Sequence, residues 1–217
     1  MKNKHAGETC IIIGNGPSLN DIPIDFLQSY PSFGTNKIFL LKNFEPTYYV
    51  SVNPAMINDI LKNHAKKLNK LSCPKFIRHS YADKVKDSIP LNSAGYWVFS
   101  KNPLNFIFEG YTVTYVCMQL AFWMGFKNVL LLGVDHYFDT QGNPNEEVIH
   151  SGIDNNHFNE HYIHEGEAWN LPDLDSSERA YQMARRAYNK DGRQIYNLTT
   201  KTALDIFIKQ DWHEWEL

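Results

Sequence analysis

The stretch with the clearest chemical signature lies near the amino terminus, where three isoleucines (residues 11–13) lead into Gly-Asn-Gly-Pro-Ser (residues 14–18). The isoleucines predict a buried strand, and the glycines let the backbone turn without a side chain in the way. The proline and serine favour a helix start. Such a junction gathers backbone N–H groups that attract a phosphate. The stretch predicts a nucleotide-binding turn or merely a tight strand-to-helix connection, and alone it does not decide between them.

Two common phosphate motifs do not fit this turn. A Walker A loop needs a lysine after its second glycine, and Pro17 stands there instead. The dinucleotide fingerprint G-x-G-x-x-G needs a third glycine, and the chain has Leu19. The turn is therefore an incomplete version of both motifs.

Polar side chains also end three other predicted strands. Asn36 lies in the strand region 33–41, Asn53 ends the strand 46–54, and Asp135 ends the apolar strand 129–135. An asparagine amide can bind a base edge or a ribose hydroxyl, but asparagine also serves turns, especially before a proline such as Pro54. An acid at the end of an apolar strand lies where open α/β sheets bind ligands, so Asp135 favours a functional role.

A polar segment of residues 139–174 contains His150, His157, His161 and His164. Their spacing fits no common zinc pattern and no cysteine accompanies them, so the segment predicts no metal site. A single histidine that acts as a general base fits better, because its pKa lies near the working pH.

The order of elements predicts the fold class. Apolar strands near 11–13, 33–41, 46–54, 73–79, 129–135 and 194–198 alternate with helices over 55–71, 112–126 and 176–189, and residues 201–208 suggest a short last helix or turn. This alternation predicts an α/β fold: one Rossmann-like nucleotide-binding domain over residues 1–217 with a mainly parallel sheet. Residues 81–105 are irregular, and residues 139–174 form a long polar lid or active-site loop.

Composition narrows the class of protein. The chain has 217 residues, 43% hydrophobic and 21% charged, and its net charge of −3 gives no footprint for a nucleic-acid partner. Its three cysteines form no C-x-x-C pair, and neither a secretory signal nor a transmembrane segment is evident. We expect a cytoplasmic protein, peripheral at the inner membrane if its acceptor lies there.

Several motifs together resemble the bacterial CMP-sialic acid sialyltransferases of the Cst-II type. They are Ile-Gly-Asn-Gly-Pro-Ser-Leu (13–19), Thr-Asn-Lys-Ile-Phe (35–39), Val-Asn-Pro (52–54), Gly-Val-Asp-His-Tyr (133–137) and His-Tyr-Ile (161–163). The last third is similar to the MptE-like group, whose founding activity is 6-hydroxymethylpterin diphosphokinase. Its features include Asn156-His157-Phe158, Trp169, Gly192-Arg193 and Tyr196-Asn197.

The resemblance to the sialyltransferases implies roles for individual residues. It implies nucleotide binding by Gly14, Asn15, Gly16, Pro17, Ser18, Asn36, Asn53 and Thr112. It also implies that Tyr137 assists the leaving phosphate and that His164 is the general base, with His161 and His157 in reserve. Two departures stand out: the His-Tyr-Ile motif is one residue shorter here, and Gly110 replaces an arginine before the helix 112–126.

Three functions follow from these observations. The first is a glycosyltransferase that uses a CMP-activated sugar, sialic acid or a related one, and a glycan acceptor, by inverting displacement with a histidine base and without metal. The second is ATP-dependent diphosphokinase chemistry on a pterin, which needs Mg²⁺ and carboxylates such as Asp135, Asp139, Glu146 and Glu147. The third is a nucleotide-binding module without activity. A homo-oligomer is compatible with all three.

Overall fold

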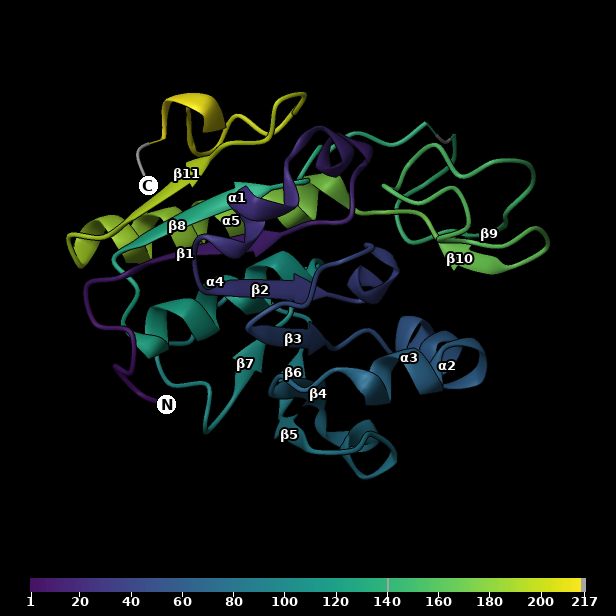
Figure 1. Cartoon of the computed structure of the whole chain (residues 1–217), viewed down its shortest axis with the longest axis horizontal. Coiled ribbons are helices and arrows are strands. Elements are labelled where there is room, and N and C mark those ends of the chain that lie inside the picture. The colour runs from purple at the N-terminus through teal and green to yellow at the C-terminus, as the bar shows by residue number, and fades with distance from the viewer. Residues whose placement is uncertain (140, 216–217) are drawn as a thin grey trace.

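The computed structural model describes residues 1–139 and 141–215, which form an α/β fold built on a parallel sheet (Figure 1). Eight strands lie side by side in the order β12 (Ile208–Lys209), β11 (Gln194–Asn197), β8 (Asn128–Leu132), β1 (Thr9–Ile13), β2 (Ser32–Thr35), β3 (Tyr48–Ser51), β4 (Lys75–Arg78) and β5 (Ser88–Leu91). All neighbouring pairs in this sheet are parallel. The expected Rossmann-like α/β class is confirmed.

Strand β1 lies inside the sheet because both of its faces are apolar. Cys10 and Ile12 pack into the core on one side, and Ile11 and Ile13 pack into the core on the other. All four side chains are inaccessible to solvent. A run of branched apolar residues is typical of a parallel strand covered on both faces.

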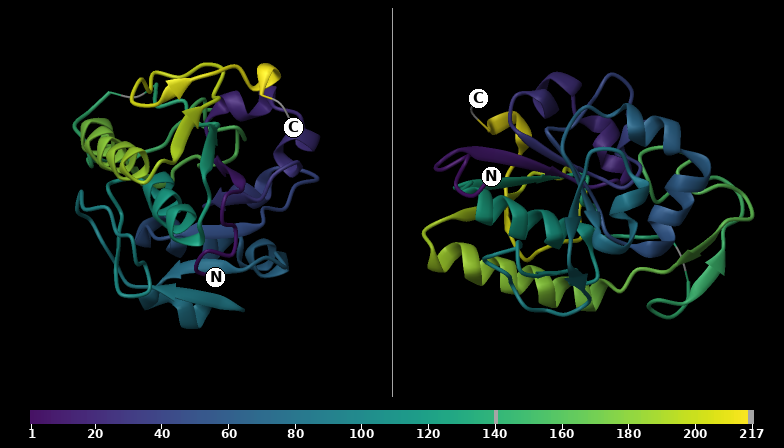
Figure 2. Two further views of the ribbon diagram at one scale, coloured as in Figure 1. Left: turned by 90° about the vertical axis from the view of Figure 1, so that its left-hand side faces the viewer. Right: turned by 90° about the horizontal axis from the view of Figure 1, so that it is seen from below.

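Helices cover both faces of this sheet (Figure 2). On one face lie α4 (Val113–Met124) and α5 (Leu174–Lys190). On the other lie α1 (Ile24–Gln28), α2 (Pro54–Asn63) and α3 (Ala65–Lys70). Four short 3₁₀ helices are η1 (Pro17–Asp21), η2 (Ile38–Leu40), η3 (His79–Lys84) and η4 (Trp212–Glu214).

The connection from β1 to β8 fixes where a ligand can enter. From β1 the chain adds β2 to β5 in order on one side, and it then returns to place β8 on the other side of β1. The strand order therefore reverses between β1 and β8. In open α/β sheets, ligands bind beyond the carboxyl ends of the strands at such a reversal.

The structure differs from the sequence predictions at several element boundaries. The strand region 33–41 ends at Thr35, because Asn36 adopts a left-handed conformation with φ of 51° and the chain turns into η2. The predicted helix 55–71 is two helices that meet at His64. Residues 201–208 form no helix, and the strand β12 follows instead.

Two segments expected to be irregular contain strands. Within residues 81–105, β5 extends the main sheet, and β6 (Ser93–Ala94) pairs in parallel with β7 (Ile107–Phe108). Within residues 139–174, β9 (Glu147–Ile149) and β10 (Ala168–Asn170) form an antiparallel pair. We call residues 141–173 the outer segment. No helix among the described residues is long and apolar enough to span a membrane.

Candidate active site

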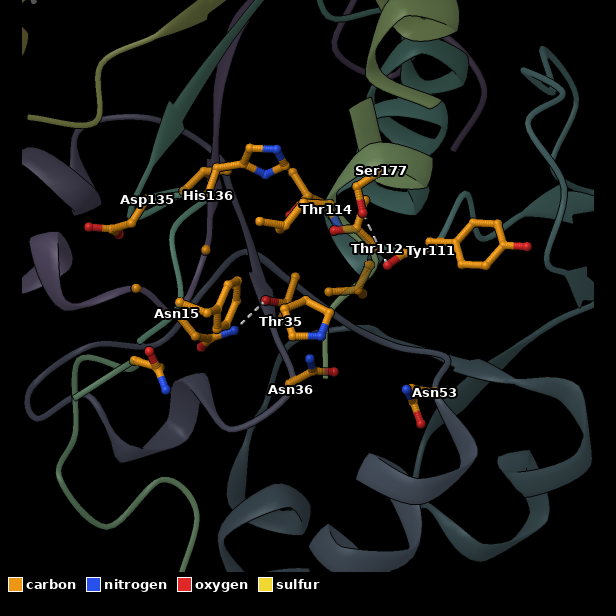
Figure 3. Close-up of a pocket in the computed structure, with 18 of the residues that line it drawn as sticks. Asn15, Thr35, Asn36, Asn53, Tyr111, Thr112, Thr114, Asp135, His136 and Ser177 are labelled. Carbon is orange, nitrogen blue, oxygen red and sulfur yellow. Dashed lines mark hydrogen bonds between the residues drawn. The ribbon is translucent and has the colours of Figure 1, made fainter. Parts of the chain in front are cut away.

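A cleft of about 480 Å³ opens at the carboxyl ends of β1 and β8, at the reversal of strand order (Figure 3). Residues 14–16 after β1 and residues 133–138 after β8 form its inner side. The start of α4 and the outer segment complete it. The candidate site residues from the sequence that line the cleft are Gly14, Asn15, Gly16, Asn36, Asn53, Thr112, Asp135, Tyr137 and His157.

The turn after β1 is bound to the end of β8. Gly14 N–H donates to Leu132 O at 2.8 Å, and Gly16 N–H donates to Gly133 O at 2.9 Å. Ser18 N–H donates to Asp135 Oδ1 at 3.2 Å. These backbone donors are therefore satisfied inside the protein. The cluster of free N–H groups that the sequence predicted for a phosphate is not formed by this turn.

Both glycines of the turn are required by packing within the chain. A Cβ on Gly14 would overlap Gly133 O, and a Cβ on Gly16 would overlap the Asp135 carboxylate. Gly16 has φ of −69°, which any residue adopts, so contact rather than backbone conformation excludes a side chain. Packing within the chain therefore accounts for both glycines, as the interpretation of a tight connection predicts. A bound phosphate is not needed to explain why glycine stands at these positions.

Asp135 ties the two inner loops together. Its Oδ2 accepts a hydrogen bond from Ser18 Oγ at 2.8 Å, and only 9% of the residue is exposed. Burial raises the pKa of Asp135, and the hydrogen bonds from Ser18 oppose this shift without cancelling it. Asp135 therefore positions the turn after β1.

The two asparagines that follow strands β2 and β3 lie on the cleft and make hydrogen bonds within the chain. Asn36 Oδ1 accepts from Ser51 Oγ at 3.0 Å. Asn53 Oδ1 accepts from Ala55 N–H at 2.9 Å and caps α2. Their nucleotide-binding roles stay predictions.

Asn15 reaches across to the end of β2. Its Nδ2 donates to Thr35 Oγ1 at 2.8 Å, while its Oδ1 is buried without a hydrogen-bond partner among the described residues. A buried, unpaired amide oxygen is uncommon in a folded protein. Asn15 therefore retains an unused acceptor beside the cleft.

The start of α4 differs from the turn after β1. Thr112 caps the helix by accepting Thr114 N–H at 3.3 Å, and Val113 N–H donates to no group in the described chain outside the helix. The amino end of a helix carries partial positive charge and free N–H groups. Because Thr112, Val113 and Thr114 all line the cleft, this helix start is its best-placed anion site.

Gly110 explains why no arginine precedes α4. Its φ is 54°, and a Cβ there would lie 2.6 Å from the Cβ of Ala180 and 2.5 Å from the Tyr115 ring. The close packing of α5 against this turn therefore excludes a long side chain at position 110.

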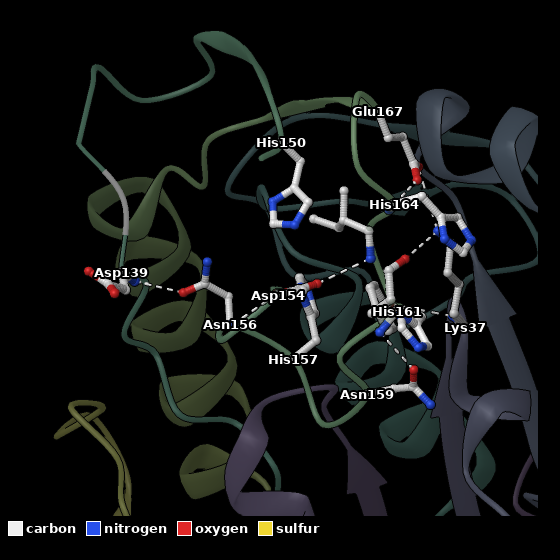
Figure 4. Close-up of polar contacts among 12 residues, drawn as sticks. Lys37, Asp139, His150, Asp154, Asn156, His157, Asn159, His161, His164 and Glu167 are labelled. Atoms are coloured by element: carbon white, nitrogen blue, oxygen red, sulfur yellow. Dashed lines mark hydrogen bonds and ion pairs between the residues drawn. The ribbon is translucent and has the colours of Figure 1, made fainter. Parts of the chain in front are cut away.

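One histidine of the outer segment lies on the cleft with a fixed ring. His157 Nδ1 is 2.8 Å from Asp154 Oδ2 (Figure 4). The His157 ring stacks on Tyr162 with centroids 3.9 Å apart. Nε2 of His157 has no hydrogen-bond partner in the described ranges. Burial raises the pKa of Asp154, but the hydrogen bonds from His157, Asn156 N–H and Ile163 N–H outweigh it and lower the pKa overall.

The other histidines of this segment lie away from the cleft. His161 is exposed and lies 3.4 Å from Glu160 Oε1. His164 is exposed, and its ring stacks on His64 with centroids 6.0 Å apart. Neither lines the cleft, so the catalytic roles implied for them by resemblance have no geometric support in this conformation. Tyr137 does line the cleft and is 67% exposed.

A buried lysine anchors the outer segment to the body of the protein. Lys37 is fully buried, and its Nζ lies 2.7 Å from Asp59 Oδ2 of α2 and 3.6 Å from Glu167 Oε1. It also donates to Tyr162 O at 2.5 Å. Burial raises the pKa of Asp59, but Lys37 outweighs it and lowers that pKa overall. Lys37 thereby positions the segment that carries His157.

Sequence reasoning missed several cleft residues. His136, Thr35, Tyr162, Ser177 and Tyr181 line the cleft. His136 directly follows Asp135, has φ of 54°, and its Nε2 lies 3.2 Å from Glu178 Oε1. Its position just after an apolar strand could have indicated that it lies on the cleft. Ser177 and Tyr181 belong to α5, and they reach the cleft only because α5 packs against segments distant in sequence.

The carboxylates proposed for Mg²⁺ do not assemble. Only Asp135 of the four lines the cleft. Glu146 accepts from Asn143 N–H at 2.7 Å. Asp139 and Glu147 are likewise not among the described residues that line the cleft. Within the part of the chain that the structure describes, no three His, Cys, Asp or Glu residues are grouped to hold a metal.

The fold is Rossmann-like α/β, and its cleft lies at the strand reversal, where open α/β sheets bind ligands. The chain belongs to the family described as 6-hydroxymethylpterin diphosphokinase MptE-like, whose profile matches residues 1–141. No curated protein matches the chain significantly.

Solved structures share the fold at low sequence identity. The MAf glycosyltransferase from Magnetospirillum magneticum AMB-1 is similar with 13% identity and a TM-score of 0.65, over 100% of this chain and 36% of that one. The chain thus spans about a third of that protein. The sialyltransferase CstII from Campylobacter jejuni, in complex with cytidine-5'-monophosphate, has 16% identity and a TM-score of 0.54, over 94% of this chain and 85% of that one. A structure of CstII in complex with CMP-3FNeuAc has 15% identity and a TM-score of 0.53, over 97% of this chain and 89% of that one.

Proposed function

We propose that the protein is a glycosyltransferase that takes a CMP-activated sugar, sialic acid or a relative, and transfers the sugar to a glycan acceptor with inversion and without metal. The fold that it shares with two glycosyltransferases, one of them solved with CMP, supports this proposal. So does the position of the cleft at the strand reversal.

The polarity of the cleft supports a nucleoside monophosphate as leaving group. None of the described residues that line it is Lys or Arg, whereas hydroxyl and amide groups are abundant. A monophosphate carries less charge than a diphosphate, so a helix start and neutral donors suffice to stabilise it. In this proposal the start of α4 at Thr112 holds the phosphate, and the exposed Tyr137 hydroxyl donates to it.

The Asp154–His157 pair is the observation that carries the mechanism. Asp154 holds Nδ1 in the protonated form, which leaves Nε2 as a free acceptor on the cleft. In the reaction, Nε2 takes the proton of an acceptor hydroxyl while that oxygen bonds to the anomeric carbon. The bond from this carbon to the phosphate oxygen breaks, and CMP leaves with the electron pair.

Family membership favours a second candidate, pyrophosphoryl transfer to a pterin. That reaction needs carboxylates to hold Mg²⁺ against adjacent phosphates. The residues present do not fit such a site, because Asp135 binds Ser18 and the other three acids lie away from the cleft. We therefore place this candidate second.

Nucleotide binding separates these candidates. Thermal unfolding is measured with CMP, CDP, UDP, ADP and ATP, each with and without Mg²⁺. CMP at 100 times its Kd should add about 2.7 kcal/mol to the free energy of unfolding, without need of Mg²⁺. Stabilisation by ATP only with Mg²⁺ would favour the diphosphokinase. Binding of CMP without turnover of CMP-sugars would favour an inactive nucleotide-binding module.

The base is tested with matched histidine variants. His157→Gln should lower kcat roughly 10²–10⁴-fold and leave CMP affinity near wild type, because Gln cannot take a proton. Asp154→Asn should lower kcat in the same direction, since Asn no longer fixes the Nδ1 proton. His161→Ala and His164→Ala are controls, and a loss confined to His164→Ala would return that residue to the role its sequence implied.

A further inference from the structure

A strained aromatic residue stands at the rim of the cleft. Tyr111 has φ of 64°, lines the cleft and is 44% exposed. A left-handed conformation is a genuine outlier for a bulky residue. Such strain persists only where the surroundings enforce it, and it gathers at ligand sites. Thr112 N–H donates to Glu109 O at 3.0 Å and closes the turn that contains Tyr111.

The ring of Tyr111 stacks on a second aromatic ring. Trp97, from the loop after β6, lies against it with centroids 5.7 Å apart and planes 25° apart. Arg179 of α5 lies over the Trp97 ring at 5.5 Å. Tyr111 itself remains 44% exposed at the cleft. We call Arg179, Trp97 and Tyr111, which come from three separate elements, the platform.

The platform lies across the cleft from the inner loops. Figure 3 shows Tyr111 on the side of the cleft opposite Asp135, with Thr112 between them. The start of α4, proposed above for the phosphate, thus separates the inner end of the cleft from the platform. The platform therefore lies next to the proposed phosphate site, on the side away from Asp135.

We propose that Tyr111 is the acceptor subsite and stacks against the C–H face of a pyranose ring; this inference rests on the proposed function. Sugar rings present C–H groups on one face, which suit the negative face of an aromatic ring, and hydroxyl groups at their edge. A partly exposed aromatic ring of this size fits a single sugar ring. Glu109, on the same turn, also lines the cleft, and its Oε1 is held by Arg78 and Ser93.

Saturation-transfer NMR with methyl glycosides of galactose, glucose and N-acetylglucosamine, in the presence of CMP, tests the platform. The wild type should transfer saturation to the ring C–H protons of at least one glycoside. Tyr111→Asn removes the ring while keeping a residue that tolerates positive φ, and it should weaken glycoside binding roughly tenfold. Tyr111→Phe should retain binding within about twofold. Tyr96→Ala is the control, because it removes an exposed aromatic ring from the loop that carries Trp97.

Each outcome bears on the inference. Unchanged glycoside binding in Tyr111→Asn, or no binding by the wild type, overturns it. Preferential binding of a pteridine probe to Tyr111 also overturns it, in favour of a planar substrate. Glycoside binding that depends on Tyr111 while CMP has no affinity supports the platform and refutes the CMP-sugar donor. CMP affinity near wild type in Tyr111→Asn separates a lost platform from a damaged nucleotide site.

Discussion

The two sides of the cleft are stabilised in different ways. The inner wall, residues 14–18 and 133–135, is held by backbone hydrogen bonds, close glycine packing and the Asp135–Ser18 pair. The outer segment, residues 141–173, is held by a few buried charged side chains, above all Lys37 and Asp154. The first arrangement leaves few groups free for a ligand. The second leaves His157 Nε2 free on the cleft.

This difference shows which parts of the cleft keep groups free for a ligand. The glycine turn, which is the most conspicuous motif in the sequence, builds a rigid support and satisfies most of its own donors. The free groups lie at the start of α4 and on the outer segment, where the sequence signal is weaker. Four predictions test this contrast.

Lys37→Met should have the largest effect on stability. It leaves Asp59 and Glu167, both only partly reached by solvent, without their cation. Removing one partner of a buried ion pair costs about 3–5 kcal/mol, and the partial exposure of the acids places the expected loss near the lower end. Urea unfolding measures it, with the exposed Lys42→Met as control. Equal stability of the two variants would show that the outer segment does not depend on Lys37.

Gly16→Val should come second. The added side chain overlaps the Asp135 carboxylate and must displace it, which we expect to lower the free energy of unfolding by about 2–3 kcal/mol. The control is Gly95→Val, since a Cβ on this other cleft glycine meets nothing within 4 Å. If Gly16→Val instead unfolds like the wild type and loses only CMP affinity, the glycine serves the ligand.

Thr112→Val should have a smaller effect. It removes the hydroxyl that caps α4, which typically costs about 1 kcal/mol. The same change should weaken CMP binding, because this helix start is the proposed phosphate site. Thr112→Ser keeps the hydroxyl and should restore both properties. Normal CMP affinity in Thr112→Val would show that the start of α4 does not bind the phosphate.

The smallest expected effect is on the pH dependence of stability, to which Asp135 of the inner wall and Asp154 of the outer segment should contribute with opposite signs. The pKa of Asp135 is raised, so its contribution to stability is complete below the ordinary Asp pKa and is lost as pH rises through the raised value. The pKa of Asp154 is lowered, so its contribution is complete above the ordinary value and is lost as pH falls through the lowered one. Unfolding free energies of Asp135→Asn and Asp154→Asn, each subtracted from wild type between pH 2.5 and 7, should therefore slope oppositely. Asp83→Asn is an exposed control, and parallel slopes would contradict the contrast.

Several features could be predicted from local sequence. The isoleucines of β1, the apolar strand β8 and the capped helix α4 carry strong patterns over short spans, and the structure has each of them. For Asn53 before Pro54 the sequence offered a local turn role as an alternative to ligand binding, and in the structure its side chain caps α2. Asp135 was predicted to lie on the cleft because it ends an apolar strand.

Other features depend on contacts between distant segments. His157 could not be told from His161 and His164 by spacing, because its position depends on Asp154, Tyr162 and the anchoring by Lys37. Local sequence also gave only weak signals for two other features. One is the division of the predicted helix 55–71 at His64, and the other is the pair of strands inside the outer segment. Resemblance selected His164, whereas packing places His157 on the cleft.

The sequence by itself determined the α/β class and the site's location at strand ends, because strand and helix periodicity and turn chemistry act over a few neighbouring residues. Only the tertiary structure decided which groups on the cleft remain free. The N–H groups of Gly14 and Gly16 are used by β8, and the carboxylate of Asp135 is used by Ser18. A donor or acceptor is available to a ligand only when no other part of the chain has satisfied it, and that depends on residues more than 100 positions away.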